Sequence, residues 1–503
     1  MEKSILSYLE RNSEIFPNKI AFADDKFQFT YNELTETARS IGTFIADKVS
    51  IKRPIAVYME KSSKNIAAFM GVAYAGCYYV PIDYQMPIER INIILKTLNP
   101  EAIIYDQATE KKLSQLESEC FKFSYDEISV TVSNKVALDK IRKYMIDTDP
   151  LYILFTSGST GIPKGVVVCH RSVIDYADWV TKTFDINEET IFGNQTPFYF
   201  SMSVLDIFST IYSGATLYIV PKMLFSFPVR LLEFLNSKKI NTIYWVPSAL
   251  GIVANLGALD DIELPYLKKI LFAGESMPTK HLNIWRKHLP DALYANLFGP
   301  TEITDIGIYY IIDREFNDDE PIPIGVPCDN VDAIIVDENR NEIKEIGKIG
   351  ELLIRGSFLA CGYYNNPIKT NEAFIQNPLN NSYPELVYCT GDLVYWNDRN
   401  ELVYAGRKDF QIKHMGNRIE LGEIETALNA LDGVDMCCCL YNSNTDQIIA
   451  VYSGSLEKKE VNKQIIKKVP RYMVPNVYNK EEEMPLNLNG KIDRQKLKNQ
   501  YIV

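Results

Sequence analysis

Hydrophobic positions change their spacing along the chain. Through the first 300 residues, continuous apolar runs rich in β-branched residues alternate with helical patterns. Residues 53–59 read RPIAVYM, 63–76 SKNIAAFMGVAYAG, 77–82 CYYVPI, 242–247 TIYWVP and 248–256 SALGIVANL. Apolar strands separated by helices are typical of largely parallel sheets that are covered by helices. The pattern predicts an α/β fold built from layers.

From about residue 322 the pattern shifts to short strands separated by turns, as in VDAIIVDENRNEI, GELLIRG, ELVYCTGDLVYW and ELVYAGRKDFQIK. This spacing predicts a more antiparallel, β-barrel-like part. After Arg407 a polar stretch leads into an amphipathic helix over 421–431, an apolar strand, a further helix and a Lys-rich end. We predict a large N-terminal domain over 1–408 and a small mobile α+β C-terminal domain over 409–503, hinged directly at Lys408-Asp409.

Composition narrows the class of protein. The chain has 503 residues, 46% of them hydrophobic, and a formal charge of −12, which argues against a nucleic-acid surface. The charged N-terminus lacks a secretory signal, and the longest uncharged run, residues 66–82, is too short for a bilayer span, so we expect a cytoplasmic protein with no membrane partner. Nine cysteines without a CxxC pair, three of them consecutive at 437–439, indicate reduced core thiols.

A loop with phosphate-binding composition follows an apolar strand at 151–168, LYILFTSGSTGIPKGVVV. Glycines let the backbone approach oxyanions, the hydroxyls donate to them, and Lys164 adds a positive charge. It is not a Walker A loop, because Lys164 precedes a glycine and a strand-forming VVV. The chain has only four histidines and no G-x-S-x-G motif, which argues against a Ser-His-Asp hydrolase.

This loop resembles the signature of the adenylate-forming enzymes, the superfamily of nonribosomal peptide adenylation domains, carrier-protein ligases, acyl-CoA synthetases and luciferases. Its other motifs follow in the family's order over nearly the full chain: FTYNEL, YAGCYYVPID, NLFGPTEIT, GELLIRGSFLACGYY, YCTGDLVYW, GRKDFQIKHMGNRIELGEIE, VPRYMVP and NLNGKIDR. The resemblance implies the adenylate-forming fold and an acid–thiol ligase that uses ATP and Mg²⁺. An acid is activated as acyl-AMP, pyrophosphate leaves, and the acyl group passes to a thiol.

The resemblance also assigns roles to residues. The catalytic group is Lys164, Thr301, Glu302 and Lys491, where Glu302 holds Mg²⁺ and Lys491 reaches the carboxylate and the α-phosphate. Asp392 accepts both ribose hydroxyls, Arg407 lies near the same ribose, and Phe298 stands where the family usually has tyrosine. The implied ATP-binding set is Thr156, Ser157, Gly158, Ser159, Thr160, Gly274, Asn296, Leu297, Phe298, Gly299, Pro300, Thr301, Asp392, Tyr404, Arg407 and Lys491. Asp409 matches the family's hinge, and Lys413 and Gly416 would line the path of the thiol.

The stretch TPFYFSMSVLD at 196–206 bears on the acid substrate. Amino-acid-activating relatives have an aspartate for the substrate's α-ammonium at the position of Ser201, and a serine cannot neutralise that charge. The implied substrate positions are Phe200, Ser201, Met202, Leu205, Tyr244, Leu271, Ala273, Leu297, Asp305 and Ile306. Two classes fit: an aryl or hydroxyaryl acid, slightly favoured, and an amino acid with its amine away from the α-carbon, such as a β-amino acid.

The resemblance favours peptide-synthetase adenylation domains and D-alanine carrier-protein ligases over acyl-CoA synthetases. We therefore expect a stand-alone ligase whose acceptor is the phosphopantetheine thiol of a separate carrier protein. Coenzyme A is the alternative acceptor, and a D-alanine-type carrier-protein ligase is an alternative interpretation. A silent adenylate-binding protein is disfavoured, because Lys164, Glu302, Asp392, Arg407 and Lys491 are all present.

Overall fold

The computed structural model describes residues 2–157, 162–408, 411–485 and 492–502 of the chain. Its largest sheet has nine strands, of which β13, β12, β11, β9, β10 and β1 run parallel to one another, so the predicted parallel α/β layer is confirmed. In spatial order the strands are β15 (Val326–Pro327), β14 (Ile308–Ile311), β13 (Leu293–Phe298), β12 (Lys269–Ala273), β11 (Thr242–Trp245), β9 (Ile191–Asn194), β10 (Thr216–Ile219), β1 (Ile20–Ala23) and β2 (Gln28–Thr30).

A seven-stranded sheet forms the second layer, and it too is parallel from β7 to β6. Its strands in spatial order are β18 (Gly362–Tyr363), β8 (Lys164–Cys169), β7 (Pro150–Thr156), β4 (Tyr78–Pro81), β3 (Pro54–Tyr58), β5 (Ala102–Tyr105) and β6 (Phe121–Ser124). The apolar run at 63–76 forms α3, which is buried on nearly all sides, as expected for a helix without a polar face.

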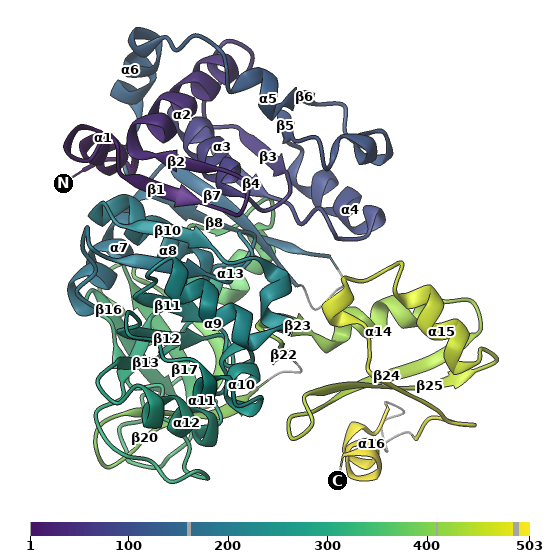
Figure 1. The fold of residues 1–503 in the computed structure, drawn as a ribbon. Helices are drawn as coiled ribbons and strands as arrows, with labels where there is room; N and C mark the ends of the chain where they lie inside the picture. Colours follow the sequence, from purple (N-terminus) through teal and green to yellow (C-terminus); the bar gives the residue numbers. More distant parts are fainter. Residues whose placement is uncertain (1, 158–161, 409–410, 486–491, 503) are drawn as a thin grey trace.

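Helices cover both large sheets (Figure 1). They are α1 (Leu6–Ile15), α2 (Tyr31–Ala46), α3 (Ser63–Tyr74), α4 (Ile88–Leu98), η1 (Glu110–Gln115), α5 (Tyr125–Ile128), α6 (Lys135–Tyr144), α7 (His170–Thr183), α8 (Ser203–Ser213), η2 (Lys222–Ser226), α9 (Pro228–Ser237), α10 (Pro247–Asn255), α11 (Ala258–Asp261), α12 (Thr279–His288), η3 (Thr301–Ile303) and α13 (Pro367–Ala373). No helix among the described residues is long and apolar enough to cross a bilayer.

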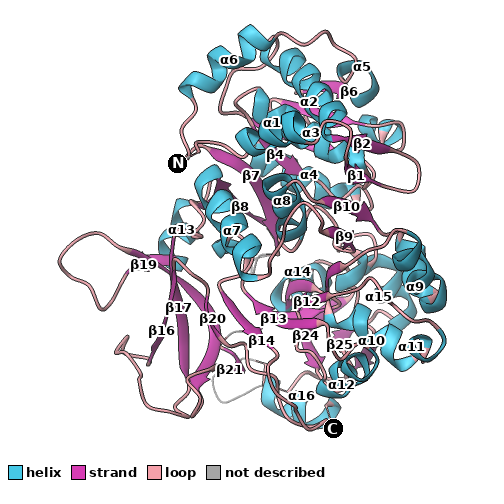
Figure 2. Cartoon of the chain, turned by 60° about the vertical axis from the view of Figure 1, so that its left-hand side comes forward, coloured by secondary structure: helices cyan, strands magenta, loops and turns pink. Residues whose placement is uncertain are grey.

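The region after residue 322 forms an antiparallel sheet, as its strand spacing predicted. Its strands are β16 (Val331–Val336), β17 (Gly350–Gly356), β20 (Leu386–Trp396), β19 (Phe374–Gln376) and β21 (Leu402–Arg407). They stand apart from the two larger sheets in Figure 2. Side chains of this sheet, among them Leu352 and Leu402, nevertheless join the hydrophobic core of the two larger sheets.

The last hundred residues build their own small cores, in which the triplet Cys437-Cys438-Cys439 is buried and unoxidised on β24. The elements are β22 (Gln411–His414), β23 (Asn417–Glu420), α14 (Leu421–Asn429), β24 (Val434–Asn442), β25 (Gln447–Gly454), α15 (Lys458–Ile465), η4 (Arg471–Met473), β26 (Val477–Lys480) and α16 (Arg494–Tyr501). The predicted boundary at Lys408-Asp409 stays a prediction, because Asp409 lies outside the described residues.

Candidate active site

The phosphate-type loop connects two antiparallel strands, β7 and β8, in which Thr156 and Lys164 are register partners. Lys164 is thus held at the start of a buried strand, and its Nζ lies 5.0 Å from the centre of the Tyr363 ring. Burial and the neighbouring Arg418 lower the pKa of Lys164, while Glu302 opposes the shift. Ser157 is buried and donates a hydrogen bond of 2.8 Å to the backbone oxygen of Arg418.

A tight loop after β13 carries several of the predicted residues, among them Thr301, Glu302 and Asp305. A Cβ on Gly299 would lie 2.2 Å from the backbone oxygen of Asp305, so only glycine allows this closure. Thr304 has a φ of 72°, a strained value for a β-branched residue, and turns the chain back. The loop therefore holds Thr301, Glu302 and Asp305 in one short, buried segment.

Glu302 is completely buried and has two charged or polar partners. Nη1 of Arg418 donates to its Oε2 at 2.6 Å, and the hydroxyl of Tyr363 donates to its Oε1 at 2.7 Å. Burial alone would raise the pKa of Glu302, but Arg418 and Lys164 outweigh it and lower the pKa to about 2. The carboxylate is therefore charged at every physiological pH.

Two strands of the antiparallel sheet bring the predicted ribose residues together. Asp392 on β20 and Arg407 on β21 are register partners, and Nη1 of Arg407 lies 2.9 Å from Oδ1 of Asp392. Asp392 is only 2% exposed. Phe298 and Tyr404, both in the predicted ATP set, have ring centres 6.0 Å apart.

A cavity of about 940 Å³ separates the two predicted domains at this place. Its lining includes predicted nucleotide residues from the large domain and residues from the small one. Among them are Gly274, Asn296, Leu297, Phe298, Tyr404, Arg407 and Lys413. The volume suits a ligand of nucleotide size.

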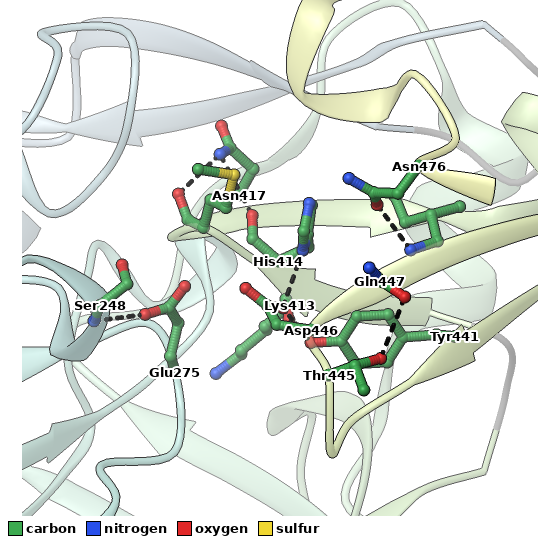
Figure 3. Close-up of polar contacts among 12 residues, drawn as sticks. Ser248, Glu275, Lys413, His414, Asn417, Tyr441, Thr445, Asp446, Gln447 and Asn476 are labelled. Carbon is green, nitrogen blue, oxygen red and sulfur yellow. Dashed lines mark hydrogen bonds and ion pairs between the residues drawn. The ribbon is translucent and has the colours of Figure 1, made fainter. Parts of the chain in front are cut away.

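The β22–β23 hairpin of the small predicted domain lines this cavity. Its tip, Met415-Gly416, has positive φ at both residues, and the backbone N–H of Gly416 donates to Oε1 of Glu275 at 2.6 Å. A Cβ on Gly416 would lie 2.6 Å from Cγ1 of Val246. Lys413 points from the hairpin toward the side of Glu275 (Figure 3), and its Nζ lies 4.6 Å from the centre of the Phe298 ring. Burial lowers the pKa of Lys413.

A second contact between the domains is a buried ion pair. Arg90 on α4 contacts Glu423 on α14, and their side chains are 6% and 2% exposed. Nearby, the ring of Tyr472 packs edge-on against Phe200 of the predicted substrate stretch, with centres 6.2 Å apart. Residues after 410 therefore contact both the predicted nucleotide positions and the predicted acid positions.

Among the predicted substrate residues, Tyr244, Ala273 and Leu297 lie near the carboxyl ends of the parallel strands β11, β12 and β13, where α/β sheets usually bind ligands. All except Phe200 and Ser201 are buried. Asp305 is 1% exposed, so it is not a solvated residue at the rim. The hydroxyls of Tyr176 and Tyr244 donate to its Oδ2 at 2.8 and 3.2 Å. Thr301 donates to the hydroxyl of Ser201 at 3.3 Å.

Some residues that contact the predicted site residues had no role assigned from the sequence. Arg418, Tyr363, Tyr176 and Glu275 contact predicted site residues but had no assigned role. Arg418 and Tyr363 lie within motifs that carried the resemblance, whereas Tyr176 on α7 has no motif to mark it. Gly158, Ser159, Thr160, Asp409 and Lys491, which the resemblance assigned to the loop, the hinge and catalysis, lie outside the described residues.

Comparisons with known proteins identify the family. Residues 9–364 match the family model described as AMP-binding enzyme. The chain is 31% identical to zwittermicin A synthase ZmaJ of Bacillus cereus over 96% of this chain and 92% of that one. It is 28% identical to the D-alanine--D-alanyl carrier protein ligase of Bacillus licheniformis over 99% and 100% of the two chains. Some curated relatives are much longer, and the chain spans 8% of tyrocidine synthase 3 of Brevibacillus parabrevis, to which it is 29% identical.

Solved structures show the same fold. A nonribosomal peptide synthetase protein containing adenylation and PCP domains superposes with a TM-score of 0.85 at 19% identity, over 99% of this chain and 84% of that one. The predicted fold class and the predicted use of ATP are thereby confirmed. The chain belongs to the AMP-binding, adenylate-forming enzyme family, and it is an AMP-forming acid–thiol ligase.

Proposed function

We propose that this ligase loads a carboxylic acid other than an ordinary α-amino acid onto the phosphopantetheine thiol of a separate carrier protein. First, the carboxylate oxygen attacks the α-phosphorus of ATP, forming acyl-AMP and releasing pyrophosphate. The thiol then attacks the acyl carbon, loses its proton, and displaces AMP. The observation that supports this most directly is the buried, ionised carboxylate of Glu302, which has the positive charges of Arg418 and Lys164 beside it.

Different residues would bind the adenine, the ribose and the phosphates of ATP in the first half-reaction. Phe298 offers a ring face for adenine, and Asp392, oriented by Arg407, offers a carboxylate for the ribose hydroxyls. Lys164 places a positive charge beside the phosphates, where phosphoryl transfer depends on charge stabilisation and positioning. Lys491, as the family resemblance implies, would contact the carboxylate and the α-phosphate.

Glu302 has the chemistry to hold Mg²⁺. It is a carboxylate that stays ionised in a buried site, and a hard cation prefers such oxygens. The described residues contain no group of three His, Cys, Asp or Glu side chains that would form a complete metal cage. This suits Mg²⁺, which commonly binds one or two carboxylates together with substrate phosphates. When bound, the ion would neutralise charge that develops on the phosphate oxygens.

The contacts of the docked hairpin support the proposal that each half-reaction uses a different orientation of the two domains. Arg418 now pairs with the carboxylate proposed to hold Mg²⁺, and Lys413 lies against the ring proposed to stack on adenine. We propose that this orientation serves thiol transfer and that rotation about Asp409 presents Lys491 for adenylation. Lys413 and Gly416 would then line the path of the thiol.

The acceptor and the acid need separate tests. Pyrophosphate exchange into ATP should be measured with aryl acids, β-amino acids and α-amino acids side by side, and the loaded enzyme should then be offered carrier protein and coenzyme A. We expect exchange with a non-α-amino acid and transfer to the carrier protein. Transfer to coenzyme A alone would make the chain an acyl-CoA or aryl-CoA ligase, and exchange with no acid would refute the proposed adenylation.

A further inference from the structure

Cys361 is the exposed member of a set of nine free cysteines, and the other eight are buried or partly buried. It directly precedes β18, the edge strand of the seven-stranded sheet that pairs with β8. Strand β8 ends at Cys169, which is 6% exposed. The fold therefore brings into one place two cysteines that are remote in the sequence and form no CxxC motif.

The backbone shows how closely the two segments approach. The N–H of Cys361 donates to the carbonyl oxygen of Val167 at 2.8 Å, although Gly362 is the register partner of Val167. Two residues of one strand thus lie opposite one residue of the other, as in a β-bulge. Cys169 follows Val167 by two residues, so both side chains point to the same face. Neighbouring strands lie about 4.8 Å apart, and a disulfide joins Cα atoms about 4.4–6.8 Å apart.

Side-chain contacts also connect the two segments. The Oγ atom of Ser172 lies 3.4 Å from Sγ of Cys169. The same hydroxyl donates at 3.1 Å to the backbone oxygen of Leu359, two residues before Cys361. The Cys361 thiol lowers the pKa of Cys169, and the Cys169 thiol raises the pKa of Cys361. The two thiol groups therefore interact with each other.

Cys169 is also the N-cap residue of α7, a helix of 14 residues. The N-terminus of a helix carries partial positive charge and unpaired backbone N–H groups, which stabilise a thiolate. The thiolate is the nucleophile in thiol–disulfide exchange. The pair thus combines an accessible sulfur at Cys361 with a sheltered sulfur at Cys169 whose charged form the helix favours.

The segment that carries Cys361 also holds Glu302 in place. The backbone N–H of Ala360 donates to the backbone oxygen of Glu302 at 2.9 Å, and the hydroxyl of Tyr363 donates to its Oε1 at 2.7 Å. A disulfide requires its two sulfur atoms to approach to about 2.05 Å. Because Cys361 lies between Ala360 and Tyr363, its movement toward Cys169 would disturb both contacts to Glu302.

We propose that Cys169 and Cys361 form a redox-active thiol pair whose disulfide slows adenylation. The oxidant is a low-molecular-weight disulfide. The Cys361 thiolate attacks one of its sulfur atoms, and the displaced small thiolate takes up the proton that Cys361 lost. The Cys169 thiolate then attacks the Cys361 sulfur, and the second small thiolate takes up the proton that Cys169 lost. The protein gives up two electrons and two protons, and the small disulfide is reduced to two thiols.

The linked cysteines can be detected directly. The full chain is incubated with oxidised glutathione, freed of glutathione, and digested with trypsin without reduction. We expect peptides 165–171 and 356–369 to be joined through Cys169 and Cys361, and the number of titratable thiols in the denatured protein to fall by two from nine.

The effect on adenylation rests on the proposed role of Glu302, whereas the disulfide itself does not. Pyrophosphate exchange is measured before and after oxidation, with the acid that the panel of acids identifies. It should fall by roughly tenfold, because the hydrogen bond from Tyr363 to the charged Glu302 weakens. Dithiothreitol should restore both thiols and the rate of exchange.

Three variants test the residues. Cys361→Ser removes the exposed sulfur and should abolish both the linked peptides and the loss of exchange. Cys169→Ser removes the second thiol, so one glutathione should stay attached to Cys361; serine is a favoured N-cap residue and should preserve α7. Cys120→Ser is the matched control, because Cys120 precedes β6 at the opposite edge of the same sheet and should leave both responses as in wild type.

The outcomes separate this inference from the proposed function. Oxidised wild type without the linked peptides would overturn the inference and leave the proposed function standing. Linked peptides with unchanged exchange, or inhibition that persists in Cys361→Ser, would also overturn it, because the disulfide would not control adenylation. Exchange with no acid in the reduced enzyme would instead refute the proposed adenylation, and with it the effect of the disulfide.

Discussion

Glu302 shows how a single side chain in this site depends on its charged neighbours. It has no exposed surface, yet Arg418 and Lys164 keep it ionised against the effect of burial. Removing its charge would leave the Arg418 guanidinium, whose side chain is 17% exposed, without its carboxylate partner. The same residue that is proposed to hold a metal thus also stabilises the docked hairpin.

Glu302→Gln should therefore lower stability by on the order of 3 kcal/mol at neutral pH. The pKa of Glu302 is lowered from 4.5 to about 2, so its contribution is complete above about pH 4.5 and is lost as the pH falls through 2. Unfolding of wild type and variant, followed by denaturant at pH 7, 5 and 3, should show a gap that is constant at the first two values and smaller at the third.

Glu372→Gln provides the control for this experiment. Glu372 pairs with Lys369 on the surface, with its side chain 57% exposed, and its loss should change stability by less than about 0.5 kcal/mol. A gap between wild type and Glu302→Gln that widens below pH 4.5 would contradict the assigned charge state.

The β22–β23 hairpin contacts the large predicted domain through hydrogen bonds and side-chain packing. Its two-residue tip needs positive φ at Met415 and Gly416, and the N–H of Gly416 reaches Glu275 in the large domain. Ser248 donates from its backbone to the other oxygen of the same carboxylate at 2.9 Å (Figure 3). Because the hairpin is short, it holds Lys413 against the Phe298 ring and Arg418 against Glu302.

Gly416→Ala should impair docking, because its Cβ would lie 2.6 Å from Val246 Cγ1. We expect transfer to the thiol from supplied acyl-adenylate to fall by roughly tenfold or more, with pyrophosphate exchange changed much less. Gly347→Ala is the matched control, since Gly347 also has a positive φ, 77°, but an added Cβ there meets no atom within 4 Å. Equal losses in the two variants would mean that backbone strain, and not docking, causes the effect.

The molecule as a whole is closed by the small domain, and the buried Arg90–Glu423 pair is one of the contacts that close it. Breaking such a pair leaves an uncompensated charge in the interface, at a penalty of roughly 3–5 kcal/mol. The docked orientation should therefore depend strongly on Arg90.

Arg90→Ala should shift the population away from the docked orientation. Small-angle scattering should report a larger radius of gyration, and proteolysis near residues 408–410 should be faster than in wild type. The control Lys369→Ala removes a surface pair within the large domain and should change neither. An unchanged radius together with unchanged proteolysis would refute a role for the pair in docking.

Lys491→Ala tests the use of two orientations. Adenylation, measured by pyrophosphate exchange, should fall by roughly 100-fold through loss of a positive charge at the reacting phosphate. Thiol transfer from supplied acyl-adenylate should be much less affected, because we assign it to the docked orientation. Equal losses in both half-reactions would rule out the proposed domain alternation.

Much of this protein follows from its sequence alone. Apolar runs at 53–59 and 242–247 became parallel strands, and the apolar helix at 63–76 became buried α3. Such elements are predictable because the spacing of apolar residues reflects which faces are buried. Ordered motifs identified the family and supplied the predicted nucleotide residues, since each motif places a required chemical group at a short local spacing.

Contacts between distant segments could not be obtained in this way. Arg418 and Glu302 are 116 residues apart, and Tyr176 and Asp305 are 129 apart. Nothing in the local pattern around Tyr176 distinguishes it from a core tyrosine. The sequence by itself determined the fold class, the family and the adenylating chemistry, because these depend on local patterns of burial and charge. Only the tertiary structure decided which buried charges pair and that Asp305 has neutral partners, because burial and distance between remote segments arise when the sheets and domains pack.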